Sequence, residues 1–107
     1  MSRQALNSAE RAGENDPVAA YMVQVSLLKA WFSNGDDASR GATAARRRSA
    51  SRDVMYGAAL TFTYTGDDKT AHTLSADLAR RFPADTMVQF DYLPTLRAKL
   101  LLNQGKA

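Results

Sequence analysis

The side chains that most often carry out chemistry are scarce in this chain. His72 is the only histidine, and there is no cysteine. Nucleophilic, acid–base and metal chemistry often depend on these two residue types, so carboxylates are the main remaining source of reactive groups. His72 stands beside the apolar positions of an expected helix, and we interpret it as a surface or boundary residue. The sequence therefore predicts no catalytic residue, no cofactor site and no metal site, and a small helical enzyme is the alternative we favour least.

Two pairs of carboxylates follow glycines in a similar way. Gly35 precedes Asp36–Asp37, and Gly66 precedes Asp67–Asp68. Paired carboxylates can act as general acid and base, but each pair also begins an expected helix, where aspartate accepts the free backbone N–H groups. Neither glycine belongs to a phosphate-binding loop, because no Lys-Ser/Thr follows at the required spacing. We interpret the aspartates as helix caps and the glycines as residues that accept a left-handed backbone at a helix end.

Arg46, Arg47 and Arg48 form the one concentrated group of charges in a chain of formal net charge +3. Three explanations stay open: a solvated helix end whose charges suit the helix dipole, a binding site for an acidic peptide or protein, and a nucleic-acid site. We favour the first. The third has the least support, because no pattern of a known nucleic-acid module accompanies the arginines.

The recurring Gly-Asp-Asp turn predicts a helical repeat protein. Its two glycines lie 31 residues apart, at positions 35 and 66, and self-similarity at such a period is typical of repeat architectures. Aromatic residues end the segment before each turn, Trp31 and Phe32 in one case and Tyr64 in the other. The chain has only six glycines and three prolines, which favours helix over sheet.

Apolar periodicity and helix-end residues divide the chain into six helices. Asp16 and Pro17 form a strong helix start, and Pro94 predicts a kink or break near 91–94. The segment 60–65 alternates like a strand, but the repeated glycine boundary that follows it favours a helix. Within a single domain over residues 1–107, the predicted helices are about 3–13, 17–33, 36–49, 52–64, 67–82 and 86–103.

The second of these helices is the most apolar. Its large residues recur at steps of three and four, which predicts one buried face, and Leu27 and Trp31 widen that face, so we expect it to pack on two sides. The stretch is interrupted by polar residues and is too short to span a bilayer, so we expect no membrane segment. The residues of the predicted face are Val18, Tyr21, Met22, Val25, Leu28 and Phe32.

The unit around Gly66 resembles a tetratricopeptide repeat. Gly66 at the turn, Ala71 five positions later and Pro83 near the end of the second helix match that family's pattern. The first unit departs from it, with Arg40 where alanine is expected, so the array is a degenerate one. The resemblance implies an all-α fold of antiparallel helical hairpins, stacked as a right-handed superhelical array that binds a protein or peptide.

The same resemblance points to the side chains that would meet a partner. In such arrays the first helix of each pair lines the concave side, which implies that Tyr56 and Tyr92 reach a groove there. Together with Arg46, Arg47 and Arg48, they are the predicted partner-binding residues. We expect a protein or peptide partner, held by apolar pockets and a few polar contacts.

Three segments resemble a narrower group. Residues 52–60, 80–86 and 92–98 are similar to helical-repeat regions that follow the catalytic domain of large bacterial serine/threonine protein kinases. The chain carries no kinase motif, so the resemblance implies an accessory region: a non-catalytic interaction or scaffold module with a regulatory or sensor role. We expect a fragment of a longer array in a larger bacterial protein, with the compartment, cytoplasmic or extracytoplasmic, left open. The alternative is a structural module that self-associates, which an exposed apolar face at either end would favour.

Overall fold

The computed structural model describes residues 3–32 and 35–105, with side chains from residue 15 onward, and this part of the chain is helical with no strand. The predicted all-α class is therefore confirmed. Five α-helices follow one another, and a π-helical turn leads into the last. Their bounds are α1 (Arg3–Trp31), α2 (Gly35–Arg48), α3 (Arg52–Thr65), α4 (Asp68–Arg81), the π-helical turn η1 (Val88–Tyr92) and α5 (Leu93–Asn103).

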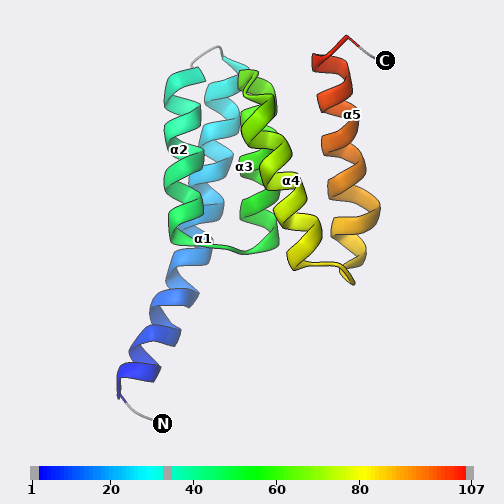
Figure 1. Cartoon of the computed structure of the whole chain (residues 1–107). Helices are drawn as coiled ribbons and strands as arrows, with labels where there is room; N and C mark the ends of the chain where they lie inside the picture. Colours follow the sequence, from blue (N-terminus) through cyan, green and yellow to red (C-terminus); the bar gives the residue numbers. More distant parts are fainter. Residues whose placement is uncertain (1–2, 33–34, 106–107) are drawn as a thin grey trace.

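The helices run alternately up and down, and each packs against the next one in the chain (Figure 1). Thus α1 contacts α2 and α3, α2 contacts α3, and α3 contacts α4 and α5, which also contact each other. The N-terminal part of α1 projects beyond the other helices (Figure 1). This arrangement makes α3 the central helix, with neighbours from both halves of the chain.

Two apolar clusters hold the helices together. The smaller one joins α1, α2 and α3 through Ala19, Val23, Ala45 and Val54. Here the helices approach closely, because a methyl group at Gly41 of α2 or Gly57 of α3 would overlap a side chain of α1. The larger cluster lies mainly among α3, α4 and α5 and includes Met55, Phe62, Leu74, Leu78, Val88, Leu96 and Leu100.

Local capping sets the boundary between α3 and α4. Gly66 ends α3 at φ 86°, and its N–H donates to the carbonyls of Phe62 and Thr63. The Asp67 carboxylate then accepts a hydrogen bond from the backbone N–H of Thr70 at 3.2 Å. The left-handed glycine and the aspartate cap are both confirmed here. The prediction for Gly35 is wrong, because Gly35 is the first residue of α2 and does not have a positive φ.

The helices predicted over 3–13 and 17–33 form one continuous helix, so the predicted boundary is wrong. Pro17 lies inside α1. A proline within a helix removes a single backbone hydrogen bond, and the turns on either side can keep their own. Asp16 is not a helix cap either, because it lies inside α1. Its carboxylate instead accepts a hydrogen bond from the hydroxyl of Ser49, which follows α2. A tertiary contact thus uses the residue that the sequence pattern assigned to a helix start.

The irregularity predicted near Pro94 is a π-helical turn and not a break. The backbone N–H of Leu93 donates to the carbonyl of Val88, five residues earlier, and the helix continues through Pro94 to Asn103. Proline cannot donate a backbone hydrogen bond, and a π-helical turn changes the bonding register just before it. The Asp85 carboxylate caps the start of this segment by accepting the N–H of Val88 at 3.2 Å.

Candidate protein-interaction faces

The structure brings together Tyr56 of α3 and Tyr92 of η1, which lie 36 positions apart in the sequence. Their rings are stacked, with centroids 3.9 Å apart and planes tilted by 2°. Both side chains are half-buried. Because each ring uses one face to contact the other, the two tyrosines form one joint surface.

Polar contacts fix this tyrosine stack in place. The Tyr92 hydroxyl donates to Asp53 Oδ1 at 2.6 Å, and this hydrogen bond raises the pKa of Tyr92 to about 12. Close by, Arg52 Nη1 donates to both carboxylate oxygens of Asp85, at 2.5 and 2.6 Å. The Arg52 guanidinium lowers the pKa of the Asp85 carboxyl below its ordinary value. These contacts tie the beginning of α3 to the segment that leads into α5.

A second aromatic contact joins α1 to α3. The Trp31 and Tyr64 rings lie 5.7 Å apart at 46°, and Trp31 is 68% exposed. From α5, Lys99 Nζ lies 4.8 Å from the centroid of the Tyr64 ring, within range of a cation–π interaction. The sequence interpretation did not single out these three residues as a site. The aromatic residues that end the segment before each Gly-Asp-Asp turn were the signal that could have found them.

The two aromatic groups belong to one surface, which we call the α1–α3–α5 face. Tyr56 and Tyr64 are eight residues apart on α3, and side chains at that spacing lie on the same side of a helix. Tyr92 and Lys99, seven residues apart, have the same relationship on the helix formed by η1 and α5. The face consists of Trp31, Asp53, Tyr56, Tyr64, Tyr92 and Lys99.

The predicted arginines lie elsewhere. Arg46, Arg47 and Arg48 are exposed in the last turn of α2, and none of them forms an ion pair with another of the side chains described from residue 15 onward. Arg46 borders a shallow groove shared with Thr73 and Arg80 of α4, whereas Arg47 lies along the outer side of α2. The three side chains therefore do not converge on one site, and they are not part of the α1–α3–α5 face.

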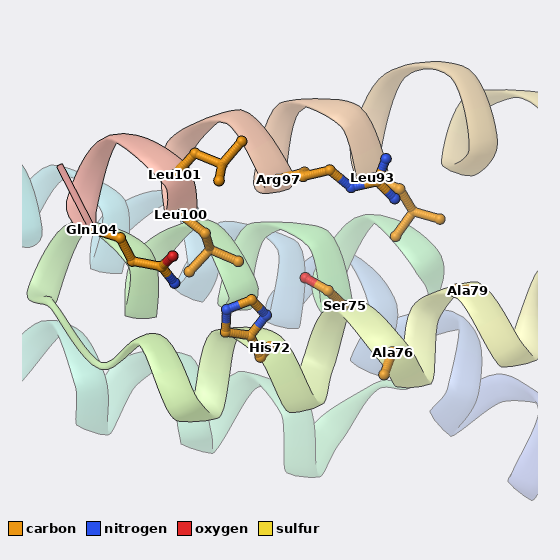
Figure 2. Close-up of a pocket in the computed structure, with 9 residues that line it drawn as sticks. All are labelled: His72, Ser75, Ala76, Ala79, Leu93, Arg97, Leu100, Leu101 and Gln104. Carbon is orange, nitrogen blue, oxygen red and sulfur yellow. The ribbon is translucent and has the colours of Figure 1, made fainter. Parts of the chain in front are cut away.

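A groove of about 300 Å³ runs between α4 and α5 (Figure 2). Its walls are mostly apolar, with Leu93, Leu100 and Leu101 from α5 and small residues from α4. The Ser75 hydroxyl is buried there without a hydrogen-bond partner among the described residues. His72, exposed at one end, faces Leu100 (Figure 2). The lining of this groove is thus mainly apolar, with a few polar groups.

The structure overturns the prediction about the large apolar face of α1. Val18, Tyr21, Leu28 and Phe32 are 41%, 68%, 60% and 81% exposed, while small residues such as Ala19 and Ser26 are buried against α2 and α3. The reason is that α1 approaches α2 at Gly41 and α3 at Gly57 so closely that only a narrow side of α1 fits against them. These four exposed residues and the half-buried Val25 are called the α1 stripe below.

Neither a cluster of metal ligands nor a membrane-spanning helix occurs among the described residues. No group of three or more His, Asp or Glu side chains is placed there to hold a metal ion. None of the helices in that part is long and apolar enough to cross a membrane.

No protein-family model, curated protein or solved structure matches this chain. Its function must therefore be argued from its own surfaces.

Proposed function

We propose that this chain is a non-catalytic protein-interaction module, and that its α1–α3–α5 face binds a protein or peptide. The observation that carries the proposal is the alignment of aromatic side chains from three helices on one surface, including the exposed Trp31. Tryptophan and tyrosine are the residues most often found at the energetic centre of protein interfaces. Their placement on α3 and on the two helices that pack against it gives the surface a fixed shape.

A tetratricopeptide-like stack is the architecture we propose for this module. In its support, each helix packs against the next, and α3 also contacts α1 and α5, which is the nearest-neighbour order of helical-hairpin arrays. In that arrangement α1, α3 and α5 are the first helices of successive hairpins, and they would line the concave side. The α1–α3–α5 face would then be the side on which such arrays hold extended or helical peptides.

The chemistry of the face suggests the kind of peptide. Trp31 and Tyr64 offer apolar ring surface, and Lys99 beside them offers a positive charge. A peptide with an apolar anchor followed by an acidic group would satisfy both. A different, acidic partner would be needed to contact Arg46, Arg47 and Arg48, because these side chains lie on another side of the molecule.

The proposal also concerns the larger protein to which this chain would belong. The resemblance to regions that follow bacterial serine/threonine kinase domains suggests a regulatory or sensor region of such a kinase. The reading frame around this segment tests that setting directly. An upstream kinase domain is expected, and a frame without one would rule the setting out while leaving the interaction role intact.

A peptide-display selection tests the interaction role. The library is selected on the immobilised chain, and each enriched peptide is measured on Trp31→Ser/Tyr64→Ser and on Arg46→Glu/Arg47→Glu/Arg48→Glu. We expect the aromatic variant to lose at least about tenfold in affinity, the effect of one moderate interface hot spot. The arginine variant should bind as the wild type does. Peptides that bind the aromatic variant at full affinity would contradict the proposal.

A structural, self-associating module is the second candidate. The observation that favours it is the α1 stripe, an exposed apolar face on the first helix of the array.

A further inference from the structure

The α1 stripe has the spacing of a coiled-coil seam. Positions 18, 21, 25, 28 and 32 follow alternate steps of three and four, which is the a/d pattern of paired helices. The pattern extends over two heptads. On the opposite side of α1, the buried Ala19, Val23 and Ser26 pack toward the bundle. The helix therefore has two contact faces, and the rest of the fold covers only one of them.

The stripe is complementary to itself when two copies run antiparallel. Aligning Val25 with Leu28 of the second copy also aligns Tyr21 with Phe32 of the second copy. Four layers result, two aromatic ones outside and two aliphatic ones inside, and all are related by one two-fold axis. Every apolar residue from 21 to 32 along the seam then faces another, which is the requirement for an isologous interface.

The charges permit this pairing. Lys29 is the only charged residue between positions 18 and 32. In the antiparallel alignment it falls opposite Gln24 of the second copy, so no like charges meet. Coiled coils that select a different partner usually do so with charges that flank the seam. This segment lacks that means of selection.

The exposed area is sufficient for a weak dimer. Tyr21, Leu28 and Phe32 are each at least 60% exposed. With side chains on the order of 150–200 Å² each, the stripe offers roughly 400–500 Å² per copy, so a pair would bury roughly 800–1,000 Å² in total. That total lies at the lower limit for a specific interface, where association is in the micromolar range.

We propose that a second copy of this chain covers the α1 stripe in an antiparallel two-fold dimer. This inference rests on the second candidate function, the self-associating module, and names the surface through which two copies meet. It uses the outer face of α1, while a peptide would use the α1–α3–α5 face. Dimer formation and peptide binding can be tested separately, because Tyr21 and Phe32 belong to the stripe and not to the α1–α3–α5 face.

Sedimentation equilibrium from about 1 µM to 1 mM tests the dimer. We expect a reversible monomer–dimer equilibrium for the wild-type chain and at least a tenfold weaker one for Phe32→Glu. Phe90→Glu is the matched control, since Phe90 is also 81% exposed but lies on η1. A strictly monomeric wild type would overturn the inference, and so would a control that disrupts the dimer as strongly as Phe32→Glu. Circular dichroism confirms that the variants fold.

Engineered cysteines test the orientation, and the chain has no native cysteine to interfere. Tyr21→Cys and Phe32→Cys chains are mixed and oxidised. The antiparallel dimer predicts a disulfide between the two variants and none within either one alone, because the axial offset would be about 16 Å against a limit near 7 Å between Cα atoms. A disulfide in Tyr21→Cys alone would indicate a parallel pair and overturn the antiparallel arrangement. Peptide binding by the monomeric Phe32→Glu chain separates this inference from the proposed function, since it should persist.

Discussion

Gly57→Ala tests whether close packing between α1 and α3 outweighs helix propensity. Gly57 lies in the middle of α3, where alanine would favour the helix by about 1 kcal/mol over glycine. The new Cβ, however, would lie 2.0 Å from Val23 Cγ1 and 3.3 Å from Val23 Cβ. A rotation of the valine side chain can relieve the first contact but not the second. The two helices must therefore separate slightly.

The expected result follows from the two opposing effects. Overpacking a core typically costs about 1–3 kcal/mol, so after the gain in propensity of about 1 kcal/mol the net loss should be about 1 kcal/mol, the middle of a range from about 0 to 2 kcal/mol. For a domain of this size each kcal/mol lowers the melting temperature by about 4–8 °C. Thermal and urea unfolding of Gly57→Ala should both show this loss.

Two variants make the reasoning refutable. Gly35→Ala is the matched control, because no heavy atom would lie closer than 3.8 Å to its Cβ, and its stability should be unchanged or higher. In Gly57→Ala/Val23→Ala the clashing methyl groups are gone, so the two substitutions should couple favourably by about 1–2 kcal/mol. If Gly57→Ala proves as stable as the wild type, the helices do not approach as closely as the structure indicates.

Three further outcomes are expected. Gly66→Ala should lower the free energy of unfolding by about 1 kcal/mol, because alanine is strained at a positive φ; equal stability in urea unfolding would contradict this. Asp85 has a lowered pKa in the folded chain, so its contribution is present above its ordinary pKa and is lost as the pH falls through the folded value. Asp85→Asn should therefore show a smaller loss of melting temperature below pH 4 than the wild type, and identical acid profiles would exclude this role. The raised pKa of Tyr92 means that its stabilising effect is complete below pH 10 and is lost as the pH rises through about 12. Asp53→Asn should make one tyrosine ionise earlier in an absorbance titration at alkaline pH, and an unchanged titration would argue against the hydrogen bond.

The candidate site was only partly predictable from the sequence. Tyr56 and Tyr92 were named from their place in an expected repeat, but their stacking needs α3 and η1 to pack side by side. Arg46, Arg47 and Arg48 were named because they are adjacent in the chain. Neighbours in a helix point about 100° apart, so adjacency in sequence did not bring them to one site.

Features that depend on near neighbours in the chain follow from the amino-acid sequence alone. The cap by Asp67 and the left-handed Gly66 follow from hydrogen bonds between residues at most four positions apart. The all-α class also follows from local features, because helix propensity and apolar periodicity depend on residues within one or two helical turns of each other. For that reason the bounds of α2, α3 and α4 agree with the predicted segments to within one residue.

Features that depend on distant partners follow from the way the helices pack together, and the sequence patterns do not reveal them. Asp16 bonds to Ser49 and does not begin a helix. The close approach of α2 and α3 at Gly41 and Gly57 admits only the narrow side of α1 that carries Ala19, Val23 and Ser26. That choice leaves the α1 stripe exposed, although periodicity alone predicted it as a buried face. A repeating pattern shows that a helix has an apolar side, but only the shapes of the neighbouring helices determine which side they cover.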